Sequence, residues 1–156
     1  MRSLAPLFIG AVACGGASSS PTSAPTPAPL PDVPFAQLEG EQRMTFMEQV
    51  VMPEARAWFA AFDPTLPEAT CETCHGEGVA DGSYELPSAQ VEPLPNTPEG
   101  FMAWVAEDAD AARWAEFMVG VVVPKMAGLL RREAFDPATE TGDFSCDACH
   151  ALVATP

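Results

Sequence analysis

Basic residues and histidines are scarce in this chain. Its 156 residues include seven Lys and Arg together against 22 Asp and Glu, and the formal net charge is −15. Binding to the phosphate backbone of DNA or RNA needs clustered basic side chains, so nucleic acids are excluded as partners. The length excludes a large multidomain enzyme, because it provides one ordinary domain or two very small units.

The first 13 residues predict an export signal. Arg2 supplies the positive charge, and residues 4–13 form an apolar stretch that is too short to span a bilayer. The Ala-Val-Ala site before Cys14 resembles the lipobox of bacterial lipoproteins, in which the cysteine becomes lipidated. Ala-x-Ala also suits an ordinary signal peptidase, so cleavage without lipidation stays open as the alternative. Both alternatives place the mature protein outside the cytoplasm.

Residues 14–34 predict a spacer. Apart from Cys14 the segment is rich in Ser and Pro, contains no aromatic residue and carries one charge, Asp32. Such segments are extended and solvated, and one that follows a lipidated cysteine serves as a tether to a membrane. The folded part of the chain is therefore expected to begin at Phe35.

The remaining sequence contains an internal repeat. Three features recur in the same order: FMEQVVMP at 46–53 and FMVGVVVP at 117–124, FDP at 62–64 and 135–137, and CETCH at 71–75 and CDACH at 146–150. A duplicated unit of helix, turn and Cys-x-x-Cys-His is the simplest interpretation. The sequence thus predicts a first unit at 35–97, which includes a Pro-rich loop, and a second unit at 98–156.

Each unit opens with apolar residues at helical spacing, over 47–62 and 118–130. A proline inside each pattern, Pro53 or Pro124, predicts a kink or a restart of the helix. The FDP turns are expected to end both helices, and Thr97-Pro98-Glu99 is typical of a helix start. No segment has the period of a strand. The predicted fold class is mainly α with long loops.

Cys-x-x-Cys-His resembles the haem attachment signature of c-type cytochromes, and it occurs here twice behind an export signal. In that family the two thiols add to the haem vinyl groups, and the adjacent histidine ligates the iron. The resemblance therefore implies two covalently attached haem c groups, with thioether bonds and axial ligation from Cys71, Cys74, His75, Cys146, Cys149 and His150.

Two other uses of the cysteines remain as alternatives. The two pairs can together form a four-thiolate zinc site, or each pair can close a short disulfide. Neither alternative explains why a histidine follows both pairs. Export into an oxidising compartment also disfavours a zinc thiolate site.

Both histidines of the chain are assigned by this resemblance, so the sixth ligand of each iron comes from another residue or is missing. Met47 and Met118 occupy equivalent places in the repeat, six residues before each helix proline, and they are the predicted distal ligands. Met126 is the alternative for the second haem, and Met52 is a further candidate. A methionine on an apolar helix face also serves as a core filler, which is the alternative for each of them.

A methionine-bearing helix followed by a turn into Cys-x-x-Cys-His is also similar to the repeating unit of the multihaem cytochrome subunit of photosynthetic reaction centres. The similarity covers about residues 46–150, with two units where that family usually has four. It implies two tandem helix-turn-motif repeats packed around two covalently bound haems. It does not imply photosynthesis.

These observations predict a one-electron carrier, not an enzyme, that works between redox proteins in the bacterial periplasm or at its membranes. The acidic surface favours a partner with a basic docking patch. One alternative is a haem enzyme or gas-binding module with an open coordination site, similar to dihaem peroxidases. Another is an electron-entry subunit of a larger membrane oxidoreductase.

Overall fold

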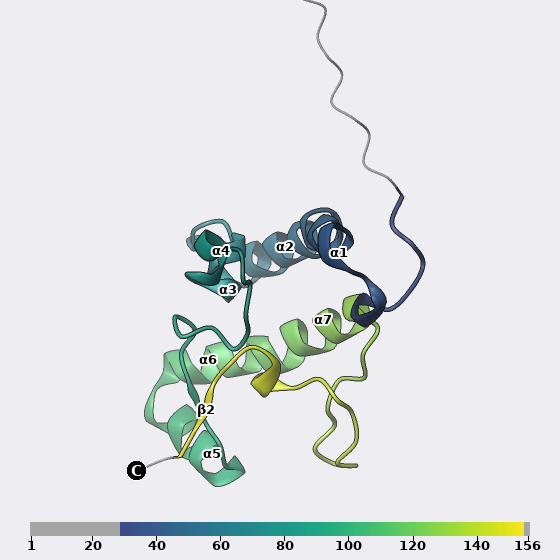
Figure 1. Ribbon diagram of the computed structural model, residues 1–156. Helices are drawn as coiled ribbons and strands as arrows, with labels where there is room; N and C mark the ends of the chain where they lie inside the picture. The colour runs from purple at the N-terminus through teal and green to yellow at the C-terminus, as the bar shows by residue number, and fades with distance from the viewer. Residues whose placement is uncertain (1–28, 155–156) are drawn as a thin grey trace, which may run out of the picture.

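The computed structural model describes residues 29–154. The predicted export signal at 1–13, the lipidation site Cys14 and most of the predicted tether lie outside the described residues. The described part is mainly helical, as the sequence predicts, and its helices are joined by long loops (Figure 1). Among residues 29–154, no helix combines the length and the apolar character that crossing a membrane requires.

The first long helical segment consists of three consecutive elements. After a short 3-10 turn, η1 (Phe35–Gln37), come α1 (Gly40–Phe46), the π-helical η2 (Met47–Val51) and α2 (Met52–Phe62). The segment ends at the FDP turn, where Asp63 leaves helical geometry and its side chain accepts a hydrogen bond from the Thr65 backbone N–H at 3.0 Å. This helix end is the predicted one.

The second long helical segment has the same local structure. It follows α5 (Pro98–Glu107) and consists of α6 (Ala109–Phe117), the π-helical η3 (Met118–Val122) and α7 (Val123–Leu130). The predicted start of α5 is confirmed, because the Thr97 side chain caps the helix by accepting a hydrogen bond from the Gly100 N–H at 3.0 Å.

Both helices pass through their prolines without the predicted restart. One π turn precedes each proline, so that the Met52 N–H donates to the Met47 carbonyl and the Val123 N–H donates to the Met118 carbonyl. A π turn holds one extra residue, and it lets the helical path continue where proline lacks an N–H. The two methionines singled out by the repeat therefore begin the two π turns.

The end of the second helix differs from the prediction. The helix ends at Leu130, before the FDP turn at 135–137, because Arg131 adopts a left-handed conformation with φ +55°. The following chain then bridges to another segment: the Phe135 N–H donates to the Phe144 carbonyl at 2.9 Å. The Arg132 side chain also contacts Asp143 at 3.1 Å. These contacts draw residues 131–136 away from the helix axis, and the sequence pattern carries no sign of them.

The two helical segments pack against each other at their π turns. The α2 helix contacts η3, and the α7 helix contacts η2, so the arrangement is reciprocal. Figure 1 shows α1 and α2 on one side of the molecule, with α6 and α7 facing them. Phe62 stacks on Phe117 with ring centroids 4.2 Å apart, beside the buried Trp58. This aromatic cluster joins the two predicted units into one core.

The remaining elements are short. The first cysteine motif forms α3 (Cys71–His75), which is followed by α4 (Gly78–Asp81), and the second forms a 3-10 turn, η4 (Cys146–Ala148). Two strands that the sequence does not predict, β1 (Leu94–Pro95) and β2 (Leu152–Val153), pair in parallel. They are too short for a periodic pattern. Their pairing ties the loop between the units to the chain beyond the second motif.

The loop before the second motif requires glycine at one position. Gly142 has φ +100°, and a Cβ there would lie 2.4 Å from the Ala134 carbonyl oxygen. Gly142→Ala is therefore expected to lower the free energy of unfolding by about 1–3 kcal/mol. Gly128 lies at an exposed position of α7, and a Cβ there meets nothing within 4 Å. Gly128→Ala is the matched control and should raise stability by up to about 1 kcal/mol. Urea unfolding midpoints measure both, and equal midpoints for the two variants would contradict this account.

Candidate functional site

The first cysteine motif is held as one helical turn. Thr70 precedes α3, and its N–H donates to the Thr73 hydroxyl at 3.0 Å. Cys71, Cys74 and His75 are half-buried. The Nδ1 atom of His75 lies 2.9 Å from the carbonyl oxygen of Tyr84, whose ring packs edge-on against the imidazole at 5.6 Å. The loop after the motif thus folds back and orients its histidine.

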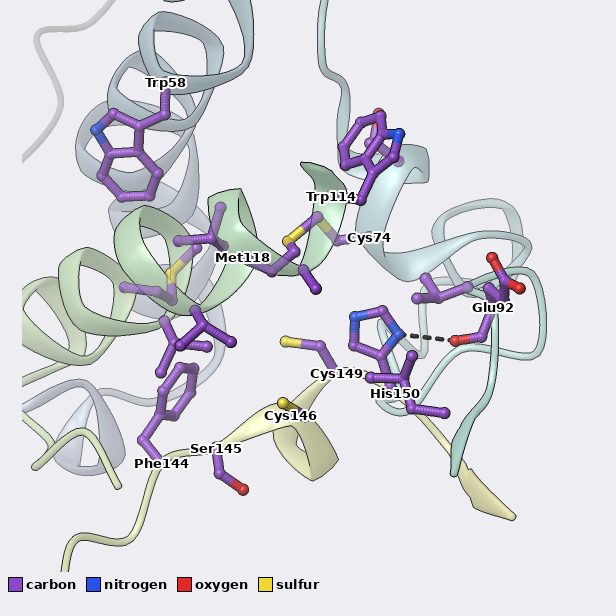
Figure 2. Close-up of a pocket in the computed structure, with 18 of the residues that line it drawn as sticks. Trp58, Cys74, Glu92, Trp114, Met118, Phe144, Ser145, Cys146, Cys149 and His150 are labelled. Atoms are coloured by element: carbon purple, nitrogen blue, oxygen red, sulfur yellow. Dashed lines mark hydrogen bonds between the residues drawn. The ribbon is translucent and has the colours of Figure 1, made fainter. Parts of the chain in front are cut away.

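The second motif has a tighter backbone. The Ser145 hydroxyl donates to the Asp147 carboxylate at 2.5 Å at the start of η4, and the His150 N–H donates to the Cys146 carbonyl at 2.8 Å. The Nδ1 atom of His150 lies 2.7 Å from the carbonyl oxygen of Glu92 (Figure 2). Glu92 belongs to the loop between the units, so this histidine is oriented by a segment far away in the sequence.

The two histidines share one arrangement. A carbonyl oxygen can only accept, so in each ring Nδ1 carries the proton and donates it. This tautomer leaves Nε2 with a free electron pair, the form in which a histidine binds a metal ion. Figure 2 shows the second ring nitrogen of His150 pointing away from Glu92, toward Cys149 and the side of the cavity where Met118 lies.

A cavity of about 320 Å³ lies in front of the second motif. Its walls are almost entirely apolar, and they come from α2, α5, the second long helix and the loop between the units. Aromatic side chains contribute much of this wall: Trp58, Phe59, Phe101, Trp104, Trp114 and Phe144. Val119 also lines the cavity although it is 56% exposed. Such an apolar space with few polar groups is typical of a cofactor site.

The two cysteine motifs converge on this cavity. Cys74 from the first motif and Cys146, Cys149 and His150 from the second all line it. In the view of Figure 2, Cys74 and Met118 lie on one side and the second motif lies on the other. Residues 71 and 75 of the first motif are not part of its lining. The convergence of Cys74 with the second motif is a feature that sequence spacing alone does not reveal.

The thiols that line the cavity are shielded from water. Burial, with Cys74, Cys146 and Asp147 as like-charged neighbours, raises the pKa of Cys149 to about 11. Burial also raises the pKa of Cys74 and of Cys146. These cysteines are therefore neutral thiols near pH 7.

The structure also bears on the two alternatives for the cysteines. Within residues 29–154 the four cysteines are free thiols, so neither pair is closed into a disulfide. The same residues contain no group of three or more His, Cys, Asp or Glu side chains placed to hold a metal ion. The four-thiolate arrangement that the zinc alternative requires is thus not formed in this part of the chain.

The candidate methionines separate into two groups. Met118 and Met126 both line the cavity with His150, and Met118 also packs against the cluster of Ala55, Trp58 and Phe117. Met47 is not among the lining residues, because it packs on the other cluster, formed by Ala127, Leu130 and Phe144. Met52 is half-buried and does not line the cavity either.

Sequence reasoning missed the contribution of the loop between the units. The Glu92 carbonyl that holds His150 and the Tyr84 carbonyl that holds His75 are backbone groups, which no residue type marks. Val91 and Leu94 of the same loop line the cavity. The prolines and glycines of this segment indicate a loop, but not that it crosses from one motif to the other.

A second recess adjoins the wall of the cavity. It is lined by Trp104 and Trp114, which both spaces share, and by four carboxylates from Glu92, Glu107, Asp108 and Asp110. Asp108 caps α6 through the Asp110 N–H at 2.9 Å, and Asp110 pairs with Arg113 at 3.3 Å. Two of the four acids thus have structural roles, and the recess adds negative charge beside the cavity.

Comparison with known proteins gives no relatives. No protein-family model matches this sequence, and no curated protein or solved structure resembles it closely enough to count as a match. The functional argument for this chain therefore depends on its own residues and their geometry.

Proposed function

We propose that this protein is a dihaem c-type cytochrome that carries single electrons between exported or membrane-bound redox partners. One observation carries the proposal: Cys146, Cys149, His150 and Met118 line the same apolar cavity. These are the residue types that attach and ligate a haem c in the His/Met cytochromes. Met118 and the motif belong to the same predicted unit, and the fold brings the helix and the motif together around one cavity.

The donor set and the cavity fit this cofactor. A macrocycle needs apolar walls, and aromatic side chains supply them here. The volume of about 320 Å³ lies within the usual range of cofactor sites, about 300–1,000 Å³. His150 has its Nδ1 committed to Glu92, which leaves the other ring nitrogen available to the iron.

Each residue of the second motif then has a defined role. Cys146 and Cys149 would hold the haem by thioether bonds, and His150 would ligate its iron. Met118 would supply the second ligand through its thioether, with Met126 as the alternative from the same wall. When bound, the haem iron supplies a reversible exchange between its ferric and ferrous states.

The first motif is assigned by the same chemistry. Cys71 and Cys74 would attach the other haem, and His75, with its Nδ1 on the Tyr84 carbonyl, would ligate its iron. Met47 is proposed as the distal ligand because it occupies the place in the first π turn that Met118 occupies in the second. Cys74, an attachment point of the first proposed haem, lines the cavity of the second motif. The two haems are therefore proposed to be neighbours.

An electron carrier fits the residues better than an enzyme. The chain has two histidines, and both are assigned as axial ligands, so neither is available to move protons for a peroxidase-like reaction. Ligands that are fixed by hydrogen bonds and packing change little when an electron arrives. Such a site suits rapid electron transfer.

The proposed location is the bacterial periplasm, with a lipid anchor on Cys14, which lies outside the described residues. The partners are redox proteins. The net charge of −15 favours partners with a basic docking surface. Association with such a partner should weaken as salt increases, because surface charges are screened.

The test is the visible spectrum of the purified, dithionite-reduced protein with haem quantified per chain, recorded before and after carbon monoxide. Two haems and no shift with carbon monoxide are expected, because both irons hold a sixth ligand. A chain without haem would overturn the proposal. Two haems with a clear shift would instead favour an open site and a catalytic or gas-binding role.

A further inference from the structure

The loop between the two motifs contacts both histidines. Residues 76–96, which we call the connecting loop, supply the Tyr84 carbonyl to His75 Nδ1 at 2.9 Å and the Glu92 carbonyl to His150 Nδ1 at 2.7 Å. The two acceptors are eight positions apart in the sequence. One continuous segment therefore orients the ring of each proposed axial ligand.

Gln90 fastens the later part of the connecting loop to the first residues of the same loop, directly after the first motif. The Oε1 atom of Gln90 accepts a hydrogen bond from the Glu77 N–H at 3.2 Å and another from the Ser88 hydroxyl at 2.9 Å. Ser88 is 5% exposed. Both bonds lie within the stretch that follows His75, so they fix the loop next to the turn that leaves α3.

The side chains of Gln90 and Ser88 approach the backbone of Gly76 closely. Gly76 has φ +53°, and a Cβ there would lie 2.1 Å from Gln90 Oε1 and 2.5 Å from Ser88 Oγ. Only a residue without a side chain permits this approach. The close approach of Gln90 to the chain directly after His75 therefore depends on the glycine at position 76.

The other end of the connecting loop is fastened beyond the second motif. The Leu94 N–H donates to the Ala151 carbonyl at 2.9 Å, and the Asn96 N–H donates to the Val153 carbonyl at 2.9 Å. These two bonds form the parallel pair of β1 and β2 directly after His150. They fix the register of the loop, and with it the position of the Glu92 carbonyl (Figure 2).

We propose that Gln90 is a positioning residue whose hydrogen bonds hold the connecting loop so that it sets the reduction potentials of both haems. The inference rests on the proposed function. A carbonyl that accepts from Nδ1–H raises the basicity of the imidazole as a ligand. A more basic ligand stabilises ferric iron over ferrous iron, so each bond lowers the potential of its haem. Gln90 lies between the two acceptors in the sequence and closes the loop onto Glu77, so we expect its loss to loosen the loop at both acceptors.

The test uses the full-length holoprotein with Gln90→Ala, Gln90→Glu and Gln37→Ala. Redox titration of Gln90→Ala should show both potentials shifted upward, and NMR should show about tenfold faster solvent exchange of the two Nδ1–H protons, as expected for about 1.4 kcal/mol of lost hydrogen bonding. Glutamate keeps an acceptor, so Gln90→Glu should restore the slow exchange. Gln37 is exposed in η1 and should leave both measurements unchanged on replacement.

Variants at Asn96 test the end of the connecting loop next to the second motif independently of the other end. Asn96→Pro removes the N–H that donates to Val153, whereas Asn96→Ala keeps it. The proline variant should accelerate solvent exchange of the Nδ1–H proton of His150 and leave that of His75 unchanged.

If Gln90→Ala alters one site or neither, or if Gln90→Glu behaves like Gln90→Ala, the inference is wrong. The haem content of the unmodified protein is measured first: absence of haem overturns the proposed function itself, whereas two haems with unaltered potentials in Gln90→Ala overturn this inference alone.

Discussion

Replacing Met118 by leucine is expected to open one of the two proposed haem irons to carbon monoxide. Met118 lines the cavity with His150, and its thioether is the proposed sixth ligand. Leucine conserves the volume of methionine at a cost of less than about 1.5 kcal/mol, so the fold survives while the sulfur ligand is lost. The reduced variant should bind about one carbon monoxide per chain, whereas the unmodified protein binds none. The measurement is a titration of the reduced protein followed by its visible spectrum.

Met126→Leu is the matched control for this experiment. Met126 lines the same cavity and packs against both core clusters, so it differs from Met118 mainly in its position along the helix. The control should bind no carbon monoxide. If Met126→Leu opens the iron and Met118→Leu does not, then Met126 is the ligand and the assignment from the repeat is wrong for the second haem.

Met47→Leu extends the same experiment to the first haem. The repeat pairs Met47 with Met118, and both residues begin a π turn. Met47 packs beside Ala127, Leu130 and Phe144, away from the lining of the His150 cavity. Its variant should therefore open the other iron, and the double variant should bind about two molecules per chain. A fully coordinated first haem in Met47→Leu would mean that Met47 serves only as packing.

Local patterns in the sequence predicted the helices well. The apolar spacing around Met47 and Met118 and the cap at Thr97 depend on neighbouring residues, and the structure has helices at these places. The end of α7 at Leu130 was predicted wrongly, because distant contacts of the following loop decide it. The π turns were also missed. A proline in a helical pattern indicates an irregularity but does not specify its type.

In the candidate site, too, local sequence patterns predicted some residues, whereas contacts between distant segments could not be predicted. The motif pattern identified His150 and its two cysteines, and the repeat identified Met118, all of which line one cavity. The sequence could not show that Cys74 joins them, since this depends on how the two helical segments cross. It also could not show the Glu92 carbonyl, because every residue has a carbonyl group and only the fold selects one.

Removal of the proposed second haem is expected to destabilise the whole molecule. The double variant Cys146→Ala, Cys149→Ala would lose both proposed attachment points, and the apolar cavity of about 320 Å³ would then collapse or be exposed to water. Replacing one large core side chain by alanine already costs about 2–5 kcal/mol, and a haem is larger than any side chain. The free energy of unfolding of an ordinary domain is about 5–15 kcal/mol, so loss of the proposed haem should remove a large part of the stability.

The residues that line the cavity also connect the two helical segments, so loss of the proposed haem should destabilise both of them. Trp58 and Phe59 from α2 line the cavity together with Trp114 from α6, and Phe59 and Trp114 also pack around Phe117 in the core between the two helical segments. Loss of the haem should therefore abolish the cooperative thermal transition of the whole chain, measured by circular dichroism with haem content determined in parallel. Ser145→Ala, a small change in the same lining, is the control and should keep the transition. A haem-free double variant that unfolds within about 1 kcal/mol of the unmodified protein would mean that the cavity does not depend on a cofactor for its support.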